Sequence, residues 1–378
     1  MMKTYQYTFL LSLLALVCCR SEEPVRQSEE EQHGERQNTG VAGFYLLNEG
    51  NMGSNKSTLD YYDFTAATYR RNIYAGVNPE VPKELGDVGN DLQIYGGRLY
   101  AVINCSNKVE VMDARTCRRI GQVDIPNCRY IRFHGRYAYV TSYAGPVVIK
   151  PDYEQQGYVA RFDTASLQVE GRCLTGFQPD ELEIAGGRIY VANSGGYMVP
   201  NYENTLSVID LESFAETGRI EVAVNLHRVR ADRHGQLWVS SRGDYYDTPS
   251  RLYCLDAATG TVTDTVSMAV SDMTLVGDSL YVCATEWSYI EMKDVVTYGI
   301  VDVRTHKLLS RRFITDGTEQ QIKKPYGIAV HPVTRDIYVT DAKNYVTPGT
   351  LYCFSLEGVL KWSVRTGDIP AHFAFLWK

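Results

Sequence analysis

The sequence predicts an all-β protein, a seven-bladed β-propeller. One observation is a strand-like segment ending in Tyr-Val, or a close variant, that recurs seven times along the chain, while no segment shows a helical period. The spacing runs from 39 residues (Tyr100 to Tyr139) to 57 (Tyr281 to Tyr338). A second observation is that each copy is flanked by further short strands and turns, which is typical of propeller blades. The anchor residues are Tyr45, Tyr100, Tyr139, Tyr190, Trp238, Tyr281 and Tyr338.

Each repeat contains four strand-like segments in a fixed order. An alternating strand such as LQIY (92–95) leads through a Gly- or Asp-containing turn into the anchor strand, for example GRLYAVIN (97–104). A third strand such as VEVMDART (109–116) follows, and a short outer strand ends the unit. An Asp recurs at the end of the third strand, where its side chain can bond nearby backbone N–H groups and start a turn. These residues are Asp113, Asp163, Asp210, Asp256 and Asp302.

The two ends of the propeller are predicted to share one blade. The unit that begins at residue 42 has its second, third and fourth strands but lacks a first one. The C-terminal GDIPAHFAFL (367–376) resembles GDVGNDLQIY (86–95), which precedes an anchor strand. We therefore expect 371–376 to supply the missing inner strand, so that the ring closes without exposed sheet edges.

The N-terminal segment predicts a lipid anchor. Residues 1–20, MMKTYQYTFLLSLLALVCCR, hold an apolar run too short to span a bilayer as a helix, which fits a secretory signal. LVCCR resembles a bacterial lipoprotein signal, which implies cleavage after residue 18 and acylation of Cys19. Residues 19–39 are acidic and polar and are predicted to form a flexible tether. Residues 40–378 then form the propeller.

Composition and motifs argue against several function classes. The net charge of −7 gives no electrostatic footprint for nucleic acid. No HExxH, GxSxG, P-loop or EF-hand pattern occurs, so we expect neither an enzyme nor a cofactor or metal site. Seven cysteines remain after the signal, an odd number without a CxxC motif, which favours buried free thiols. These are Cys105, Cys117, Cys128, Cys173, Cys254, Cys283 and Cys353.

One set of connections is predicted to form a binding face. In a four-stranded blade, the loop between the second and third strands lies on the same face as the blade-to-blade links. Six of these seven loops are long, as in GGYMVPNYENT (195–205), and they concentrate Tyr, Trp, Met and Asn. Long loops on a rigid scaffold are usually functional, and Tyr with Asn is typical of adaptable binding surfaces. The candidate ligand-binding residues are Tyr143, Tyr153, Tyr197, Tyr202, Tyr245, Tyr246, Trp287, Tyr289 and Tyr345, with Asn48, Asn51, Asn193, Asn201 and Asn344.

Two resemblances extend this interpretation. The recurring LYV, VID and TG elements make 40–378 similar to the YncE-like, surface-layer-type propellers. The lipoprotein signal, the acidic tether, FYLLNEGNMGSNKSTLDYYD (44–63) and the tyrosine-rich loops together resemble the BtuG family of Bacteroidetes surface lipoproteins. That resemblance implies an outer-membrane, cell-surface location. It also implies a propeller that captures corrinoid (vitamin B12) and passes it to a TonB-dependent outer-membrane transporter, BtuB.

Two other classes of function stay open. The first is a glycan-binding or carbohydrate-active propeller, because aromatic loops also stack on sugars and a pair of loop carboxylates could act as acid and base. The second is a protein-interaction scaffold, in which the tyrosines contact a partner. A convergent carboxylate pair or a bound calcium would favour the first, and a flat loop face would favour the second. The loop carboxylates are Asp152, Glu154, Glu203, Asp244, Asp247, Glu286 and Asp294.

Overall fold

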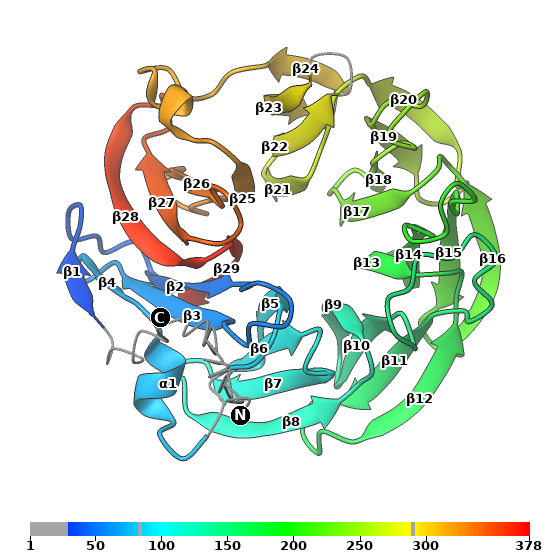
Figure 1. Cartoon of the computed structure of the whole chain (residues 1–378), viewed down its shortest axis with the longest axis horizontal. Helices are drawn as coiled ribbons and strands as arrows, with labels where there is room; N and C mark the ends of the chain where they lie inside the picture. The colour runs from blue at the N-terminus through cyan, green and yellow to red at the C-terminus, as the bar shows by residue number, and fades with distance from the viewer. Residues whose placement is uncertain (1–28, 82–84, 289–291) are drawn as a thin grey trace, which may run out of the picture.

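The structure is a computed structural model that describes residues 29–81, 85–288 and 292–378. The predicted signal peptide and Cys19 lie outside the described residues. Seven antiparallel sheets surround a central axis, as the sequence predicted (Figure 1). Six sheets have four strands, and the first has a fifth strand at its outer edge.

From the inner strand outward, the blades contain the following strands. The first is β29 (Pro370–Trp377), β2 (Val41–Asn48), β3 (Thr58–Asp63), β4 (Thr68–Arg70) and β1 (Glu30–Gln32), followed along the chain by helix α1 (Ile73–Val77). The second is β5 (Gly89–Tyr95), β6 (Arg98–Ile103), β7 (Lys108–Asp113) and β8 (Arg119–Asp124). The third is β9 (Cys128–His134), β10 (Tyr137–Ser142), β11 (Tyr158–Asp163) and β12 (Val169–Leu174). The fourth is β13 (Pro179–Ala185), β14 (Arg188–Asn193), β15 (Thr205–Asp210) and β16 (Ala215–Glu221).

The remaining three blades repeat this order. The fifth is β17 (Leu226–Ala231), β18 (Gln236–Ser241), β19 (Arg251–Asp256) and β20 (Val262–Val266). The sixth is β21 (Asp272–Val276), β22 (Ser279–Ser288), β23 (Lys293–Asp302) and β24 (Lys307–Ser310), followed by the 3-10 helix η1 (Thr318–Gln321). The seventh is β25 (Pro325–Val330), β26 (Ile337–Asp341), β27 (Pro348–Phe354) and β28 (Leu360–Asp368).

The anchor residues pack between neighbouring blades. All seven are buried, and the hydroxyl groups of two of them bond the next blade. The Tyr45 hydroxyl donates to the Ala114 carbonyl of the second blade at 2.8 Å, and Tyr190 donates to Ala257 of the fifth at 2.7 Å. The repeated residue therefore supplies apolar contact between blades throughout, and at Tyr45 and Tyr190 a hydrogen bond as well.

Ring closure and the turn chemistry are confirmed. β29 pairs with β2 in the first blade, with Tyr45 opposite Ala374. The Asp113 carboxylate accepts hydrogen bonds from Arg115 N at 3.0 Å and Thr116 N at 2.8 Å, the turn role predicted for the repeated Asp. All seven cysteines after the signal are unpaired, and all but the partly exposed Cys105 are buried.

Two segments differ from their predictions. Part of the expected tether, 30–32, forms β1, whose register places Glu31 opposite Tyr69 of β4. Ion pairs between Arg71 and both Glu29 and Glu31 hold it there, so this end of the acidic run has a basic partner. The expected loop 285–297 is largely an extension of the β22–β23 hairpin, in which Trp287 lies opposite Asp294. Its Thr and Val residues favour an extended backbone.

Buried carboxylates link three pairs of inner strands near the axis. The side chains of Asp91, Glu181 and Asp272 each accept a hydrogen bond from a backbone N–H of the next inner strand, at 2.9–3.0 Å. The donors are Ile131, Val229 and Ile328. The last two follow register shifts in β17 and β25, where pairing with the second strand is interrupted. The carboxylate thus satisfies a buried donor that the sheet leaves without a partner.

Arginines compensate these buried charges. Glu181 forms ion pairs with Arg132, at 2.7 Å, and with Arg230. Burial alone would raise the pKa of Glu181, but Arg230, Arg132 and Arg228 outweigh that effect and hold the pKa at about 2. The side chain is therefore a charged, fully enclosed part of the ring.

We predict that Glu181→Gln destabilises the propeller by about 3–5 kcal/mol, because it leaves buried arginines without their carboxylate. Chemical denaturation at neutral pH measures the loss. Glu183→Gln is the matched control: its carboxylate lies 3.7 Å from Arg132 and is more exposed, so its loss should be below about 1 kcal/mol. Equal losses in the two variants would contradict the assigned role of Glu181.

The same contact predicts a pH dependence. The pKa of Glu181 is lowered from 4.5 to about 2 on folding, so its charge stabilises the fold above pH 4.5 and this contribution is lost as the pH falls toward 2. The difference corresponds to about 3 kcal/mol. Unfolding free energies of wild type and Glu181→Gln should therefore converge between pH 4.5 and 2, and a constant gap across this window would refute the prediction.

Candidate functional site

The long loops place exposed apolar side chains on one face of the ring. Ten of the 21 large hydrophobic residues exposed among the described residues lie in these loops or at the tip of the β22–β23 hairpin. We call this set the loop-face patch. Exposed apolar groups gathered in this way mark interaction surfaces more often than scattered ones do. The members are Met52, Val147, Val148, Ile149, Val199, Tyr245, Tyr246, Trp287, Met292 and Val346.

Four of the predicted aromatic residues present their rings near this surface. Tyr245 is 51% exposed, Tyr246 75% and Trp287 49%. Tyr202 is half-buried, with its ring centroid 6.4 Å from that of Tyr245 in an edge-on arrangement. The loops of the fourth and fifth blades thus bring Tyr202 and Tyr245 together, and Trp287 lies on the sixth blade. Tyr289 lies outside the described residues.

The other predicted tyrosines are held by contacts within the protein. Tyr143 is buried, and its hydroxyl donates to Asp180 at 2.8 Å. Tyr197 lies with its ring centroid 6.4 Å from that of Tyr143, and Tyr345 packs 5.8 Å from Tyr326. The Tyr153 hydroxyl donates to the Pro146 carbonyl of its own loop at 3.2 Å. These rings shape the loops, and Tyr197 and Tyr345 keep part of their surface exposed.

Two of the five predicted asparagines belong to the interior. Asn48 and Asn193 are fully buried. The Asn48 side chain donates to Thr58 at 3.0 Å, and that of Asn193 donates to Thr205 at 3.0 Å and to Ser207 at 2.9 Å. Their amides satisfy groups within a blade, which leaves no surface for a ligand.

The other three asparagines organise the loops. The Asn51 side chain donates to the Tyr345 carbonyl and joins the loops of the first and seventh blades. The Asn201 side chain donates to the Pro151 carbonyl at 3.2 Å and joins the loops of the third and fourth blades. The Asn344 carboxamide oxygen accepts bonds from Val346 N and Thr347 N within its own turn. Asn201 and Asn344 remain exposed.

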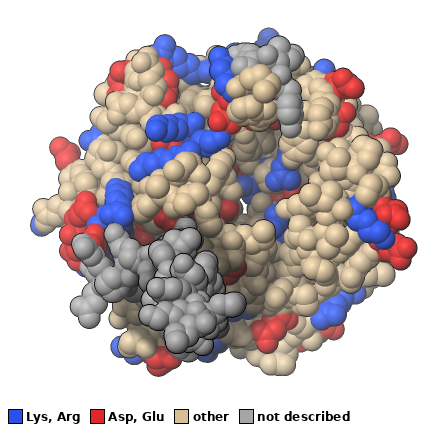
Figure 2. All heavy atoms as spheres, viewed as in Figure 1, with Lys and Arg blue, Asp and Glu red and all other residues tan. Residues whose placement is uncertain are grey.

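Two arginines that the sequence analysis did not include among the site residues lie near the axis and share one buried carboxylate. Arg129 and Arg242 approach the two oxygens of Asp180, at 3.4 and 3.1 Å. Arg129 also lies over the Tyr143 ring, 4.7 Å from its centroid. Two guanidinium groups therefore share one carboxylate, which leaves an excess of positive charge. Lysine and arginine side chains are visible in the central opening in Figure 2.

The sequence did contain a signal for this cluster. The inner strands β9 (CRYIRFH), β13 (PDELEIA) and β17 (LHRVRA) carry charged residues, whereas a wholly apolar inner strand would carry none. Burial, together with Arg242 and Arg228, lowers the pKa of His227 well below its usual value, so this imidazole is neutral. Its Nδ1 is buried without a hydrogen-bond partner in the described structure.

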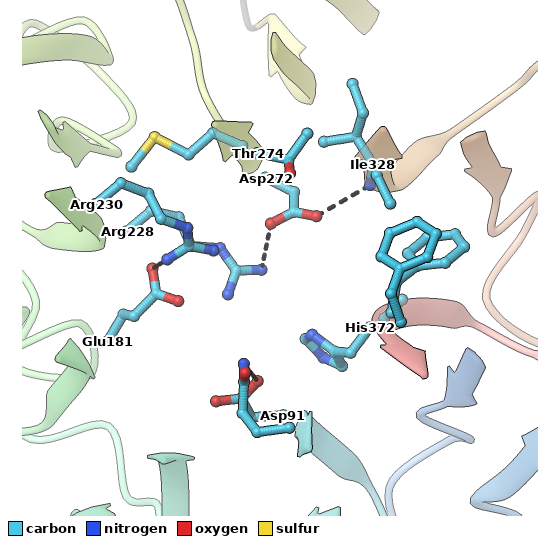
Figure 3. Close-up of a pocket in the computed structure, with 14 residues that line it drawn as sticks. Asp91, Glu181, Arg228, Arg230, Asp272, Thr274, Ile328 and His372 are labelled. Atoms are coloured by element: carbon cyan, nitrogen blue, oxygen red, sulfur yellow. Dashed lines mark hydrogen bonds and ion pairs between the residues drawn. The ribbon is translucent and has the colours of Figure 1, made fainter. Parts of the chain in front are cut away.

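A small polar cavity of about 150 Å³ lies on the axis (Figure 3). Asp91, Glu181, Arg228 and Arg230 line it, with His372 on the opposite side. The charged groups already have partners, because Arg228 pairs with Asp272 at 3.4 Å and His372 with Glu49 at 3.0 Å. Drug-sized ligands need about 300–1,000 Å³, so this cavity suits ordered water.

Most loop carboxylates have separate local partners. Asp244 accepts bonds from the backbone of Tyr246 and Thr248, Asp152 pairs with Lys150 at 3.6 Å, and Asp294 pairs with Lys324 at 2.6 Å. The Glu203 carboxylate accepts from Phe177 N, and Glu286 bonds Ser250.

Within the described residues, no group of three or more His, Cys, Asp or Glu could hold a metal ion. Nor does that part of the chain contain a helix of the length and apolarity needed to cross a membrane.

Comparisons with known proteins agree on the architecture. Hydrazine synthase of Kuenenia stuttgartiensis superimposes with a TM-score of 0.57 at 16% identity, covering 71% of this chain and 77% of that one. A quinonprotein alcohol dehydrogenase-like protein of Bacteroides thetaiotaomicron gives a TM-score of 0.56 at 14% identity, covering 90% and 79%. At this identity the likeness is one of fold alone. No curated protein matches the chain.

A family model described as a domain of unknown function (DUF5074) matches residues 42–364, which is nearly the whole propeller. The chain therefore belongs to the DUF5074 family.

Proposed function

We propose that this protein is a lipid-anchored cell-surface protein of the outer membrane that captures a corrinoid on its loop face and passes it to a TonB-dependent transporter. The observation that carries the proposal is the loop-face patch, in which Tyr245, Tyr246 and Trp287 are about half exposed or more. Exposed aromatic rings on a rigid ring-shaped scaffold provide flat contact area at a low cost in side-chain entropy.

The chemistry of a corrinoid matches this surface. The macrocycle is broad, and amide groups fringe it, so it needs aromatic contact together with amide and hydroxyl partners. Asn201 and Asn344 supply exposed amides from two of the long loops. The axial cavity of about 150 Å³ is too small for a macrocycle, which favours the loop face over the channel.

The charge at the axis is compatible with the same ligand class. Arg129 and Arg242 share Asp180, and Arg242 keeps 31% of its side chain exposed. A corrinoid that retains its nucleotide loop carries one phosphodiester, and arginine is well suited to pair with phosphate. The excess positive charge would therefore help to orient such a ligand over the opening.

The anchor is proposed from the sequence. Lipidation at Cys19 would hold the propeller at the membrane through one lipidated residue, without nucleic-acid or direct membrane contacts. Because β1 packs beside β4, the chain from Cys19 would leave the ring at the outer edge of the first blade. The remaining tether would then be about ten residues long.

The two alternatives receive less support. Glycan binding would use the same aromatic rings, but Asp152, Glu203, Asp244, Glu286 and Asp294 each bond a different partner, and none of these contacts joins two carboxylates. A protein-interaction scaffold remains a second use of an exposed apolar face. We therefore treat glycan or protein binding as outcomes of the test below.

The proposal predicts that the chain without residues 1–19 binds cyanocobalamin with one-to-one stoichiometry in calorimetric titration. Replacing Tyr245 and Tyr246 together by Ala should weaken binding about tenfold or more, because exposed aromatic anchors dominate such interfaces. The same variant should unfold at the wild-type temperature, since both rings are largely exposed.

Trp377→Ala is the matched control. Trp377 is 54% exposed but lies at the opposite end of its inner strand from the long loops. The Trp377→Ala variant should bind cyanocobalamin like wild type. Absence of binding by the wild-type protein at high micromolar ligand would overturn the corrinoid proposal, and equal weakening in both variants would remove the site from the loop face.

A further inference from the structure

Two arginines flank a single carboxylate at the end of the central channel that lies on the side of the long loops. Arg129 and Asp180 are the second residues of their inner strands, β9 and β13. Arg242 directly follows β18 and begins the long loop of the fifth blade. All three residues therefore lie where the chain enters or leaves a blade on the loop face.

The two guanidinium groups meet on Asp180, whose side chain is fully buried. Arg242 Nη1 lies 3.1 Å from Asp180 Oδ2, and Arg129 Nη2 lies 3.4 Å from Asp180 Oδ1. Oδ1 also accepts a hydrogen bond from the Tyr143 hydroxyl at 2.8 Å. One negative charge thus faces two positive charges, and one of its oxygens is shared with a neutral donor.

The other charges around the channel do not supply the missing counter-ion. Deeper in the channel, ion pairs join three arginines to three carboxylates, so this set compensates itself. These residues are Arg132, Arg228 and Arg230 with Asp91, Glu181 and Asp272. On the side of the first and seventh blades, Glu49 accepts from the Tyr326 hydroxyl at 2.9 Å and pairs with His372 at 3.0 Å. The excess of positive charge therefore stays with Arg129 and Arg242.

Another carboxylate shared by two arginines lies on the opposite face and is compensated. Asp278 pairs with Arg233 at 2.5 Å and with Arg304 at 3.6 Å. Arg304 has a second carboxylate beside it, Asp302, at 3.5 Å. Two arginines thus meet two carboxylates there, whereas the pair at the channel has one carboxylate within the described part of the chain.

The pair can be reached from the loop face. The side chain of Arg242 is 31% exposed and that of Arg129 is 17% exposed. Tyr245 of the loop-face patch lies close enough to Arg242 to interact with it electrostatically. Figure 2 shows lysine and arginine side chains in the central opening. Two guanidinium groups from different blades offer planar sets of donors that suit the several oxygens of a tetrahedral phosphate.

We propose that Arg129 and Arg242 form a binding site for a phosphate group at the loop-face end of the channel. Asp180 holds the two guanidinium groups in position, and the phosphate supplies the second negative charge. Two sources offer this chemistry: the phosphodiester of a corrinoid that retains its nucleotide loop, and inorganic phosphate from solution. The first source rests on the function proposed above, but the site itself does not.

The test titrates the chain without residues 1–19 with millimolar inorganic phosphate, at an ionic strength held constant with sodium chloride. Calorimetry and phosphorus NMR should show saturable binding with one-to-one stoichiometry. Arg242→Gln should weaken this binding about tenfold or more, because it removes a charged donor group. Arg233→Gln is the matched control, since Arg233 also shares a carboxylate with a second arginine, and it should bind like wild type. Absence of saturable binding, or an equal loss in the two variants, would overturn the proposal.

A variant with an effect of opposite sign guards against a folding defect. Asp180→Asn removes the internal counter-ion but keeps an acceptor for the arginines, so it should bind phosphate more tightly than wild type. General destabilisation would not produce such a gain. If Arg242→Gln fails to fold, unchanged or weaker phosphate binding by Asp180→Asn would contradict the site.

The source of the phosphate is identified with cyanocobalamin and with cobinamide, a corrinoid without the nucleotide loop. If Arg242→Gln weakens binding of cyanocobalamin but not of cobinamide, the site holds the phosphodiester of the captured ligand. If both corrinoids keep their affinity while inorganic phosphate loses its own, the site takes free phosphate. Absence of binding of either corrinoid to the wild-type protein would overturn the corrinoid proposal alone, because phosphate binding is measured without them.

Discussion

The hydrogen bond that a backbone N–H of one inner strand donates to a buried carboxylate of the preceding inner strand is the constraint on which the ring depends. Ile131 N donates to Asp91, Val229 N to Glu181 and Ile328 N to Asp272. An inner strand has a neighbour on one side alone, so the amides that it turns toward the axis need an acceptor. A carboxylate supplies one, but its charge then needs arginine. The polar axis is thus a consequence of how the blades are joined.

The fold could be predicted from the sequence because its signals are local and repeated. Tyr45, Tyr190 and the other anchors recur with the same neighbours, and Asp113 and its equivalents start the same turn in successive blades. Ring closure could also be predicted, because the first blade lacked an inner strand and the C-terminal strand belonged to no other blade. Each of these features needs at most one neighbouring blade to be understood.

The site was less predictable because a side chain's role depends on partners that are distant in sequence. Asn193 and Asn201 read alike in the sequence, yet Asn193 satisfies two hydroxyl groups within its blade while Asn201 reaches a neighbouring loop. Arg132 reads as a solvated charge but pairs with Glu181, 49 residues away. The tether prediction failed over 30–32 for the same reason, since its partner Arg71 lies beyond the acidic run.

Two arginines of the third blade are held between blades in different ways. Arg132 contacts the carboxylates of Asp91 and Glu181 and closes a network that the ring requires. Arg161 contacts aromatic rings instead, although a carboxylate nearby would have compensated its desolvation. Arg161 lies between Tyr137 of its own blade and Phe214 of the fourth blade, so aromatic contacts across the blade interface take the place of an ion pair.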